Sequence, residues 1–389
     1  MRVLTGLEVL LRERLNDLRG KRIGLLVHQA SVDRGLRHAV DLLGSLRGVE
    51  LTTLFAPEHG LRGEAQDHAL IRSGMDPRTG FPVVSLYGRQ RAPSRDSLSR
   101  LNLLVVDLQD VGSRYYTFIW STVLAMQACA RNGVDVLVLD RPNPLGGVRL
   151  EGNCLDPRFS SFVGLYPIPV RHGLTIGELA RFLNGRQQLG CRLTVVPMRG
   201  WRRAMRWEDT DLPWIAPSPN MPTPATARVY PGACLVEGTN LSEGRGTTRP
   251  FEYVGAPFMD AHGWAQALNT LNLPGIRFRP SYFRPAFHKY RGRGCGGVQW
   301  HVLDQARFKP YLTGLALLAT ARRMAPEHFD WRKPPYEFER KKLPIDLLCG
   351  TDRIRKAIEA GRPLPEIEAS WQRELAGFKR SRQRFLLYS

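Results

Sequence analysis

The turn at residues 54–64, with the sequence LFAPEHGLRGE, carries closely spaced groups that could do chemistry. The run just before it, 49–55 (VELTTLF), has the apolar and β-branched composition of a strand. Pro57 restricts the preceding residue to extended backbone, so this strand should end before Glu58. The turn would then present four polar side chains at the carboxyl end of a strand, where open α/β sheets bind their ligands. These are Glu58, His59, Arg62 and Glu64.

Carboxyl groups on such a turn suit acid–base hydrolysis of a glycosidic bond. Glycoside cleavage commonly uses one protonated carboxyl group to assist the leaving oxygen and one ionised group to activate water or attack carbon. Glu58 is the candidate acid. Glutamate ordinarily titrates near pH ~4.3, so an acid that works near neutrality needs burial or a neighbouring like charge. His59 either pairs with Glu58 or holds the turn through a backbone bond, and both readings stay open.

A second polar stretch at 237–248 (EGTNLSEGRGTT) combines glycines with hydrogen-bonding side chains. Flexible backbone together with carboxylate, amide and guanidinium groups is the composition of a sugar or phosphate pocket, although a plain surface loop is the alternative. The groups concerned are Glu237, Asn240, Glu243 and Arg245.

Four apolar runs with the composition of buried parallel strands each end in polar residues. The runs are 22–28, 49–55, 101–107 and 134–139. Besides the turn at Glu58, their ends carry His28, then Asp107, Gln109, Asp110 and Arg114, then Asp140, Arg141 and Asn143. One polar residue after a strand is often only the start of a loop. Four such ends in succession favour a shared crevice, because the carboxyl ends of parallel strands lie along one edge of a sheet.

The other elements expected from the pattern complete a mixed α/β fold. Thr175, followed three residues later by Glu178, has the pattern of a capping box at the start of a helix. The proline-rich stretch 213–232 reads as a long loop near a domain boundary, which divides the chain into 1–225 and a smaller α/β domain, 226–389. Further helices are expected at 7–19, 35–46, 119–131, 310–324 and 351–387, and further strands at 80–86, 191–196 and 295–303.

Composition narrows the range of partners. The chain has 389 residues with 43% hydrophobic and 24% charged residues, which is ordinary globular material. A net charge of +20 raises nucleic acid, a membrane surface or an anionic polymer as partners. The basic clusters are short, however, so they read as solvated faces and nucleic acid is not expected as a partner.

No cofactor, metal or membrane span is predicted. The first strand leads into His28-Gln-Ala-Ser and not into GxGxxG, no P-loop pattern occurs, and no His or Cys spacing suits a metal. The six cysteines include no CxxC pair and read as buried thiols. The first fifteen residues lack the apolar core and cleavage site of a signal peptide, so a cytoplasmic location is expected, or a periplasmic or secreted one if a leader has been removed.

Six motifs together resemble the NamZ family of exo-β-N-acetylmuramidases, formerly a domain of unknown function. They are FAPEHGLRG, DLQDVGSRYYTF, DRPNP, RHGLTIGELA, PSPNMPT and YPGACLVEGTNLSEGRGTTRPFEYVGAP. The resemblance runs nearly from end to end. It implies an exo-acting glycoside hydrolase that removes terminal non-reducing N-acetylmuramic acid from peptidoglycan fragments. It also implies a Rossmann-like domain joined to a second α/β domain, with the site in the cleft between them.

The resemblance places the family's glutamate and histidine on Glu58 and His59. The carboxylate that partners Glu58 is left open between Glu237, Glu243 and the acetamido group of the substrate itself, which can act as the nucleophile. Arg114, Arg141 and Arg245 are candidates for the lactyl carboxylate, because a guanidinium matches a carboxylate bidentately. The same motifs add Tyr116 and Asn220 to the substrate-binding candidates. The competing hypothesis is a non-catalytic protein that binds muropeptides or an anionic wall polymer.

Overall fold

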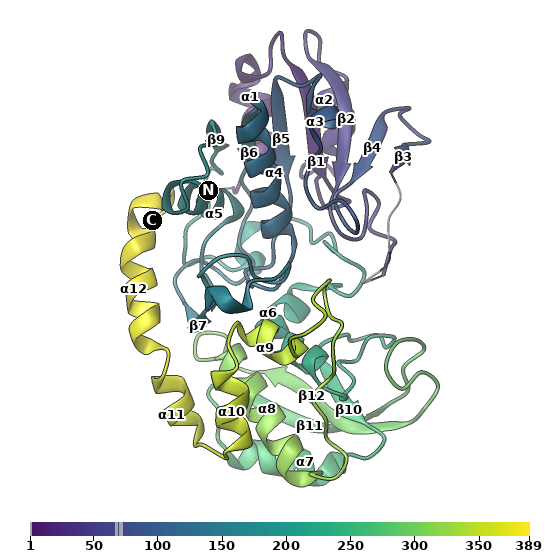
Figure 1. The fold of residues 1–389 in the computed structure, drawn as a ribbon, viewed down its shortest axis with the longest axis vertical. Helices are drawn as coiled ribbons and strands as arrows, with labels where there is room; N and C mark the ends of the chain where they lie inside the picture. Colours follow the sequence, from purple (N-terminus) through teal and green to yellow (C-terminus); the bar gives the residue numbers. More distant parts are fainter. Residues whose placement is uncertain (1, 67–68, 70–72) are drawn as a thin grey trace.

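The computed structural model describes residues 2–66, 69 and 73–389, and its largest element is a seven-stranded sheet in the first half of the chain (Figure 1). The strand order is β3-β4-β2-β1-β5-β6-β9; β3 runs antiparallel to β4, and the other neighbours pair in parallel. The strands are β1 (Arg22–Val27), β2 (Glu50–Ala56), β3 (Gly74–Met75), β4 (Pro82–Ser85), β5 (Leu103–Asp107), β6 (Asp135–Leu139) and β9 (Leu193–Val196).

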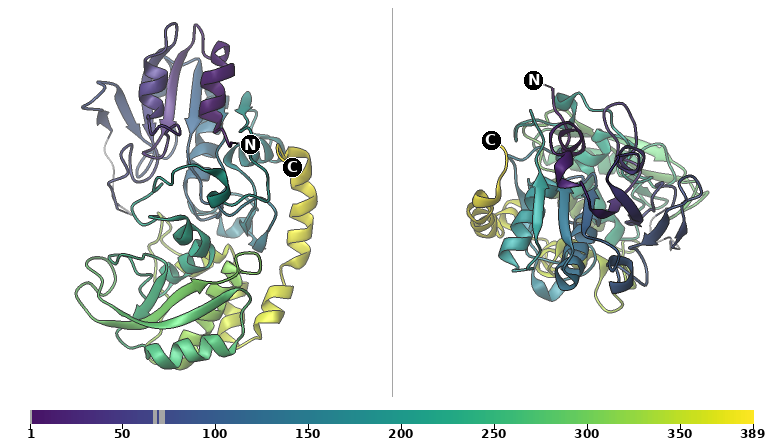
Figure 2. Two further views of the ribbon diagram at one scale, coloured as in Figure 1. Left: turned by 180° about the vertical axis from the view of Figure 1, so that it is seen from behind. Right: turned by 90° about the horizontal axis from the view of Figure 1, so that it is seen from above.

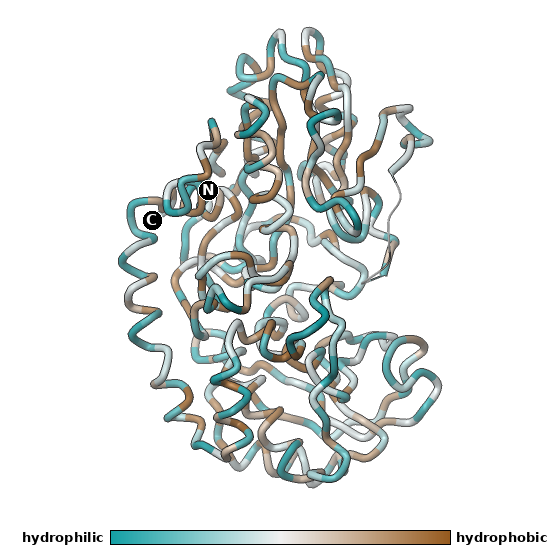
Figure 3. Tube along the Cα trace, viewed as in Figure 1, coloured by the Kyte–Doolittle hydropathy of each residue, from teal (hydrophilic) through white to brown (hydrophobic). Residues whose placement is uncertain are grey.

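Helices cover both faces of this sheet, which is why its central strands are continuously apolar. Alternate residues of β1, including Leu25, pack with α1 (Gly6–Glu13) and α2 (Ala39–Gly44) in one cluster, whereas Leu26 belongs to the cluster that contains α4 (Phe118–Asn132). Figure 3 shows the resulting hydrophobic runs along the strands of the sheet. The four predicted strand ends therefore share one edge, since β2, β1, β5 and β6 are adjacent and parallel.

Two predicted helices of the first domain are shorter than expected, and the helix expected at 351–387 is divided into three. The helix expected at 7–19 ends at Glu13 and continues as a 3-10 turn, η1 (Leu15–Asp17). The helix expected at 35–46 begins only at Ala39, because the side chain of His38 accepts a hydrogen bond from the Val40 amide and caps it. By contrast, the predicted capping box is confirmed, with Thr175 and Glu178 at the start of α5 (Ile176–Arg186). The remaining elements between α2 and α5 are α3 (Arg95–Leu98), β7 (Glu151–Cys154), η2 (Pro157–Phe159) and β8 (Pro169–Arg171).

The second half of the chain builds a smaller antiparallel sheet of order β10-β12-β11. Its strands are β10 (Tyr253–Ala256), β11 (Ile276–Phe283) and β12 (Cys295–Val302), and its helices include α7 (Ala261–Thr270) and α8 (Pro310–Met324). The prediction of a loop over 213–232 is wrong for its last part, which forms α6 (Pro224–Ala233). The 3-10 turn η3 (Trp207–Thr210) comes before this stretch. Thr223 caps this helix, and Pro224 occupies its first position. Proline suits that position because a backbone N–H there would have no partner within the helix.

Close packing of α6 on α8 positions the next segment of the chain. A Cβ atom added at Gly232 would lie 1.9 Å from the carbonyl oxygen of Pro310, and one at Gly314 would lie 2.4 Å from the carbonyl oxygen of Gly232. Only glycine allows this approach of the two backbones. Immediately after α6 the chain forms η4 (Cys234–Gly238), a 3-10 turn that carries Glu237.

The last part of the chain returns to the first domain. After α9 (Pro344–Cys349), α10 (Arg353–Glu359) and α11 (Leu364–Ala369), helix α12 (Gln372–Arg382) runs along one side of the molecule from the lower domain to the upper one (Figures 1 and 2). Beyond η5 (Gln383–Phe385), the amide of Leu387 donates to Glu178 at 2.9 Å and the hydroxyl of Tyr388 donates to Asp140 at 2.5 Å. The second domain is thus tied to the first by its own C-terminal segment.

Candidate active site

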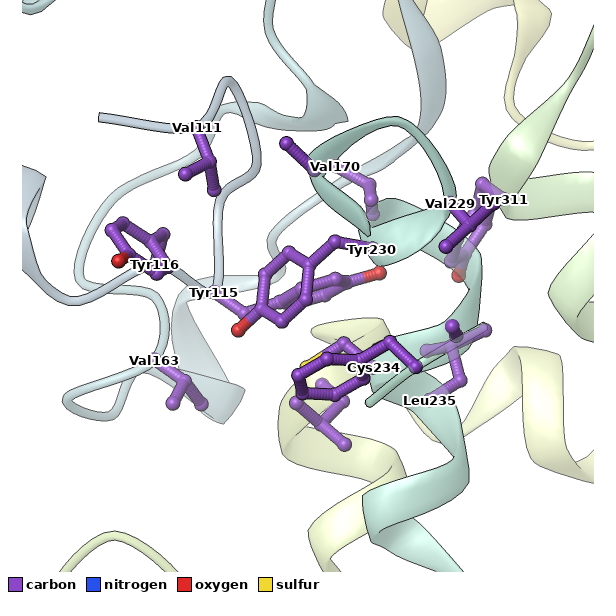
Figure 4. Close-up of a cluster of buried hydrophobic side chains, with 14 of the residues drawn as sticks. Val111, Tyr115, Tyr116, Val163, Val170, Val229, Tyr230, Cys234, Leu235 and Tyr311 are labelled. Atoms are coloured by element: carbon purple, nitrogen blue, oxygen red, sulfur yellow. The ribbon is translucent and has the colours of Figure 1, made fainter. Parts of the chain in front are cut away.

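A polar pocket lies at the carboxyl edge of the main sheet and is lined by both halves of the chain. Aromatic side chains form its floor: Tyr116 packs edge-on against Phe118 at 4.8 Å and against Tyr230 at 5.9 Å between ring centroids. Figure 4 shows Tyr115 and Tyr116, from the loop after β5, beside Tyr230 of α6. The polar lining comprises Glu58, His59, Tyr115, Tyr116, Thr117, Ser218, Asn220, Tyr230, Glu237, Arg245, Tyr336 and Glu337.

Glu58 follows β2 and points into this pocket with little solvent contact. Its side chain is 6% exposed, and the hydroxyl of Thr117 donates to Oε2 at 2.6 Å. Thr117 stands just before α4, so a rigid helix fixes the donor. The carboxyl group is therefore held in one orientation, as a group that transfers a proton to a bound substrate must be.

His59 has a backbone conformation that few residues other than glycine adopt. Its φ is +71°, and Gly60 continues the left-handed turn at +82°. The ring is fixed, because Nδ1 donates to the carbonyl oxygen of Ala65 at 2.8 Å and a carbonyl can only accept. Of the two readings of this histidine, the structure favours the one in which it holds the turn beside Glu58.

The predicted polar stretch after α6 supplies a buried ion-pair network. Glu237 accepts from Nη2 of Arg245 at 2.8 Å and from the hydroxyl of Tyr336 at 2.6 Å. Behind them, Glu243 contacts Nε of Arg245 at 3.3 Å, and Lys289 donates to Glu243 at 3.0 Å. Glu243 is wholly buried and is not among the residues that line the pocket, so the structure separates the two glutamates into a lining group and a supporting group.

The charges around Glu243 keep it ionised. Burial raises the pKa of this carboxyl, but the positive charges of Lys289, His288 and Arg245 outweigh burial and hold the pKa well below its usual value. A permanent negative charge behind Arg245 fixes the position of the guanidinium.

Several groups of the site were missed by the sequence analysis, among them Glu337 and its partner Tyr87. Glu337 lines the pocket, and the hydroxyl of Tyr87 donates to its Oε2 at 3.2 Å. Burial, followed by the charges of Glu58 and Glu337, raises the pKa of Tyr87. Glu337 stands at no predicted strand end and in no glycine-rich stretch, which were the signals used. Tyr87 directly follows the strand predicted at 80–86, but the end of that strand was not among those considered. The sequence around Glu337, KPPYEFER, marks a proline-bounded turn that could have indicated it.

His28 is fully buried and does not line the pocket. Its Nε2 accepts from the amide of Gln109 at 2.9 Å, and its Nδ1 faces the carbonyl oxygen of Pro217 at 3.3 Å. Burial, followed by the nearby charge of Arg141, lowers the pKa of His28 well below the ordinary value. His28 therefore joins β1, the end of β5 and the loop before α6, and it is not in the pocket lining.

All three arginines considered for a substrate carboxylate have partners within the protein, and of the three only Arg245 lines the pocket. Arg141 forks onto Asp107, with Nε to Oδ1 at 2.5 Å and Nη2 to Oδ2 at 2.8 Å, and both side chains are buried. Arg114 is fully buried and donates to the carbonyl oxygens of Asn153 at 2.8 Å and Leu348 at 2.9 Å. Arg114 and Arg141 thus hold the scaffold together and do not line the pocket, which corrects the expectation that they face the substrate.

Several other predicted binding residues also support the scaffold. Asp140 accepts from Thr175 at 2.7 Å, and burial raises its pKa to about 7. The structure places Gln109, Asp110 and Asn143 in buried loop contacts, Asn240 against the 328–330 backbone, Arg62 on Asp76 and Glu64 in solvent. The strand ends do converge as predicted. Most of their polar groups bond within the protein, however, and do not line the pocket.

Family models for exo-β-N-acetylmuramidase NamZ match this chain along nearly its whole length. The N-terminal model matches residues 23–225 and the C-terminal model matches residues 228–388. The chain belongs to the NamZ family. It is 44% identical over 387 residues to the peptidoglycan β-N-acetylmuramidase NamZ of Bacillus subtilis strain 168, covering 100% of this chain and 92% of that protein. Both the family membership predicted from the motifs and the class of enzyme, a glycosidase, are confirmed.

Solved structures support the same fold. A DUF1343 family protein of Bacteroides fragilis superposes with a TM-score of 0.91 at 36% identity, covering 100% of this chain and 99% of that one. A second DUF1343 protein of the same species gives a TM-score of 0.80 at 32% identity, with the same coverage. The NamZ-family fold is thus the predicted one, with a mostly parallel α/β sheet and a second, smaller domain.

Proposed function

We propose that this chain is an exo-β-N-acetylmuramidase that releases terminal non-reducing N-acetylmuramic acid from peptidoglycan fragments, with Glu58 as the general acid. Membership of the NamZ family supports the reaction, and the position of Glu58 supports its role. The observation that carries this assignment is the carboxyl of Glu58 in the pocket, 6% exposed and oriented by the 2.6 Å bond from Thr117. In this role Glu58 transfers its proton to the glycosidic oxygen as the bond to the anomeric carbon breaks.

Arg245 is the proposed partner of the lactyl carboxylate that distinguishes N-acetylmuramic acid from N-acetylglucosamine. Its guanidinium lines the pocket, lies over the ring of Phe251 at 5.0 Å and is backed by the ionised Glu243. A guanidinium held in a fixed plane suits bidentate binding of a carboxylate. In this proposal each domain supplies one group to the pocket: the acid comes from 1–225 and the arginine from 226–389.

We further propose that the enzyme acts in the cytoplasm on imported peptidoglycan fragments. Six free cysteines, most of them buried, are typical of a protein in a reducing compartment. Across the part of the chain that the structure describes, no helix is both long and apolar enough to cross a bilayer. Fractionation of the source cells, with the chain recovered beside a cytoplasmic marker, tests the location.

The test of the activity is release of N-acetylmuramic acid from a MurNAc–GlcNAc disaccharide. Glu58→Gln keeps the shape of the side chain but removes its acid, so the rate should fall by about 10²–10⁴-fold. Glu50→Gln is the matched control, because Glu50 is an exposed residue at the other end of the same strand. No turnover by the unmodified chain would reject the enzyme, and an active Glu58→Gln variant would reject the acid.

A further inference from the structure

We propose that Glu337 is the second catalytic carboxyl group, in the same pocket as Glu58. This inference rests on the proposed function and adds the group that accepts a proton while Glu58 donates one. It starts from two observations: Glu58 and Glu337 both line the pocket, and the hydroxyl of Tyr87 donates to Oε2 of Glu337 at 3.2 Å.

Glu337 sits in a turn whose backbone is unfavourable for its residue type. The amides and carbonyls of Tyr336 and Glu339 bond to each other at 2.9 Å in both directions, which closes a hairpin of two residues. Glu337 and Phe338 occupy the two central positions with φ of +44° and +68°. Such turns strongly favour asparagine and glycine. Side chains retained there against this preference point to a function for those side chains.

All three residues at 336–338 contact the site or its wall. Tyr336 donates to Glu237 at 2.6 Å, Glu337 accepts from Tyr87, and Phe338 packs on the ring of Tyr87 at 5.4 Å. Arg91 lies over Phe338 at 5.2 Å and secures it to the first domain. The loop before α9 thus reaches up from the lower domain toward the main sheet, as Figure 1 shows in yellow-green. These contacts hold Glu337 in a fixed position at the pocket.

One turnover can then be written with its protons balanced. Glu58 gives its proton to the leaving oxygen as the glycosidic bond breaks, and Glu337 takes one proton from the group that attacks the anomeric carbon. That group is water, or the acetamido group, which loses its N–H proton as it closes to a neutral oxazoline that water later opens. Exchange with solvent water afterwards removes this proton from Glu337 and returns one to Glu58. The sum is addition of one water across the glycosidic bond, and the starting state is restored.

Substrates with different leaving groups separate the two carboxyl roles. Para-nitrophenolate leaves without protonation, so Glu58→Gln should be slow on the MurNAc–GlcNAc disaccharide and much less impaired on para-nitrophenyl N-acetylmuramide. Glu337→Gln should lose about 10²–10⁴-fold on both substrates, because both need the proton acceptor. Its rate should also lose the acidic limb of the pH profile, which reports ionisation of the base. Glu339→Gln, in the same turn but outside the pocket lining, is the matched control and should behave as the unmodified chain.

The outcomes distinguish this inference from the function on which it rests. If Glu58→Gln is impaired while Glu337→Gln stays within threefold of the unmodified chain, Glu337 is not catalytic and the proposed function stands. If the unmodified chain cleaves neither substrate, both proposals fall. Glu337→Asn excludes a purely structural role, because asparagine suits the left-handed turn. We expect this variant to unfold at the same or a higher temperature and to be inactive; loss of folding together with activity would contradict the proposal.

Discussion

Arg245 is the residue that we propose selects the sugar accepted by the pocket. The lining includes three glutamates, Glu58, Glu237 and Glu337, and a guanidinium that must attract an anionic sugar past them. Arg245→Lys keeps the charge but loses the planar fork. We expect the KM for MurNAc substrates to rise roughly 10- to 100-fold, the equivalent of about 1.5–3 kcal/mol, with a smaller change in kcat.

The control for this substitution is Arg249→Lys. Arg249 follows in the same loop, is half exposed and pairs with Glu252 at 3.0 Å, so the change should leave KM unaltered. Cleavage of para-nitrophenyl N-acetylglucosaminide provides a second check, because that sugar lacks the lactyl group. An equal loss by Arg245→Lys on both sugars would show that Arg245 does not read the lactyl carboxylate.

His28 makes the stability of the fold depend on pH. Its pKa is lowered by burial and by Arg141, so the folded protein resists protonation where an unfolded histidine, with a pKa near ~6.5, binds a proton. Stability should therefore be unaffected above that pH and fall as pH drops below it, by up to about 1.4 kcal/mol per pH unit. His28→Gln should be less stable at pH 7 but show a flatter decline between pH 7 and 5.

Urea unfolding at several pH values measures this effect. His262→Gln, at an exposed histidine at the start of α7, should keep the slope of the unmodified chain. Parallel declines for the His28 variant and the unmodified chain would show that another group controls the acid limb. His38, whose pKa burial also lowers, is the next residue to test.

At the scale of elements, the strand ends could be predicted and the pocket only in part. Glu58 was predictable because its strand, its proline and its turn are local signals. Glu237 and Arg245 were predictable as a glycine-rich polar stretch. Glu337 was not, because it reaches the site only through the tertiary packing of Phe338 on Tyr87. Nor could local patterns show that Asp107 would be neutralised by Arg141, since 34 residues separate them.

The contact of α6 with α8 links helix packing to the site. Gly232→Ala would place a methyl group 1.9 Å from the carbonyl oxygen of Pro310 and force the helices apart. The free energy of unfolding should fall by about 2–3 kcal/mol. Activity should fall as well, because η4 and Glu237 follow directly after α6. Thermal unfolding and the disaccharide assay measure the two effects.

Gly377→Ala is a control for which we expect the opposite change in stability. Gly377 lies within α12, where an added Cβ meets no other atom within 4 Å. Alanine is there the better helix former, by about 0.5–1 kcal/mol, so this variant should be slightly more stable and equally active. Equal effects of the two substitutions would mean that helix propensity, and not the close approach at Gly232, governs the result.

At the scale of the whole molecule, the pocket exists only while two domains keep their relative position. Glu58 comes from one domain, whereas Glu237, Arg245 and Glu337 come from the other. Contacts at the pocket itself, such as the hydroxyl of Tyr115 on the carbonyl oxygen of Pro231 at 2.9 Å, join the domains from within. Helix α12 and the residues after it join them from outside. Substitutions in that outer connection should therefore affect catalysis from a distance.

Tyr388 tests this connection. Its ring packs on Trp201 at 4.9 Å, and its hydroxyl donates to Asp140 and accepts from the amide of Met198 at 2.9 Å. Tyr388→Phe would leave both partners buried without this bond, so stability should fall by about 1–3 kcal/mol. Without the hydroxyl, the pKa of Asp140, already raised to about 7 by burial, should rise further. Thermal unfolding at pH 7 measures the loss, and Tyr282→Phe, at a tyrosine that is 70% exposed, should leave it unchanged. Unaltered stability in Tyr388→Phe would mean that the aromatic packing alone holds the segment after α12 on the first domain.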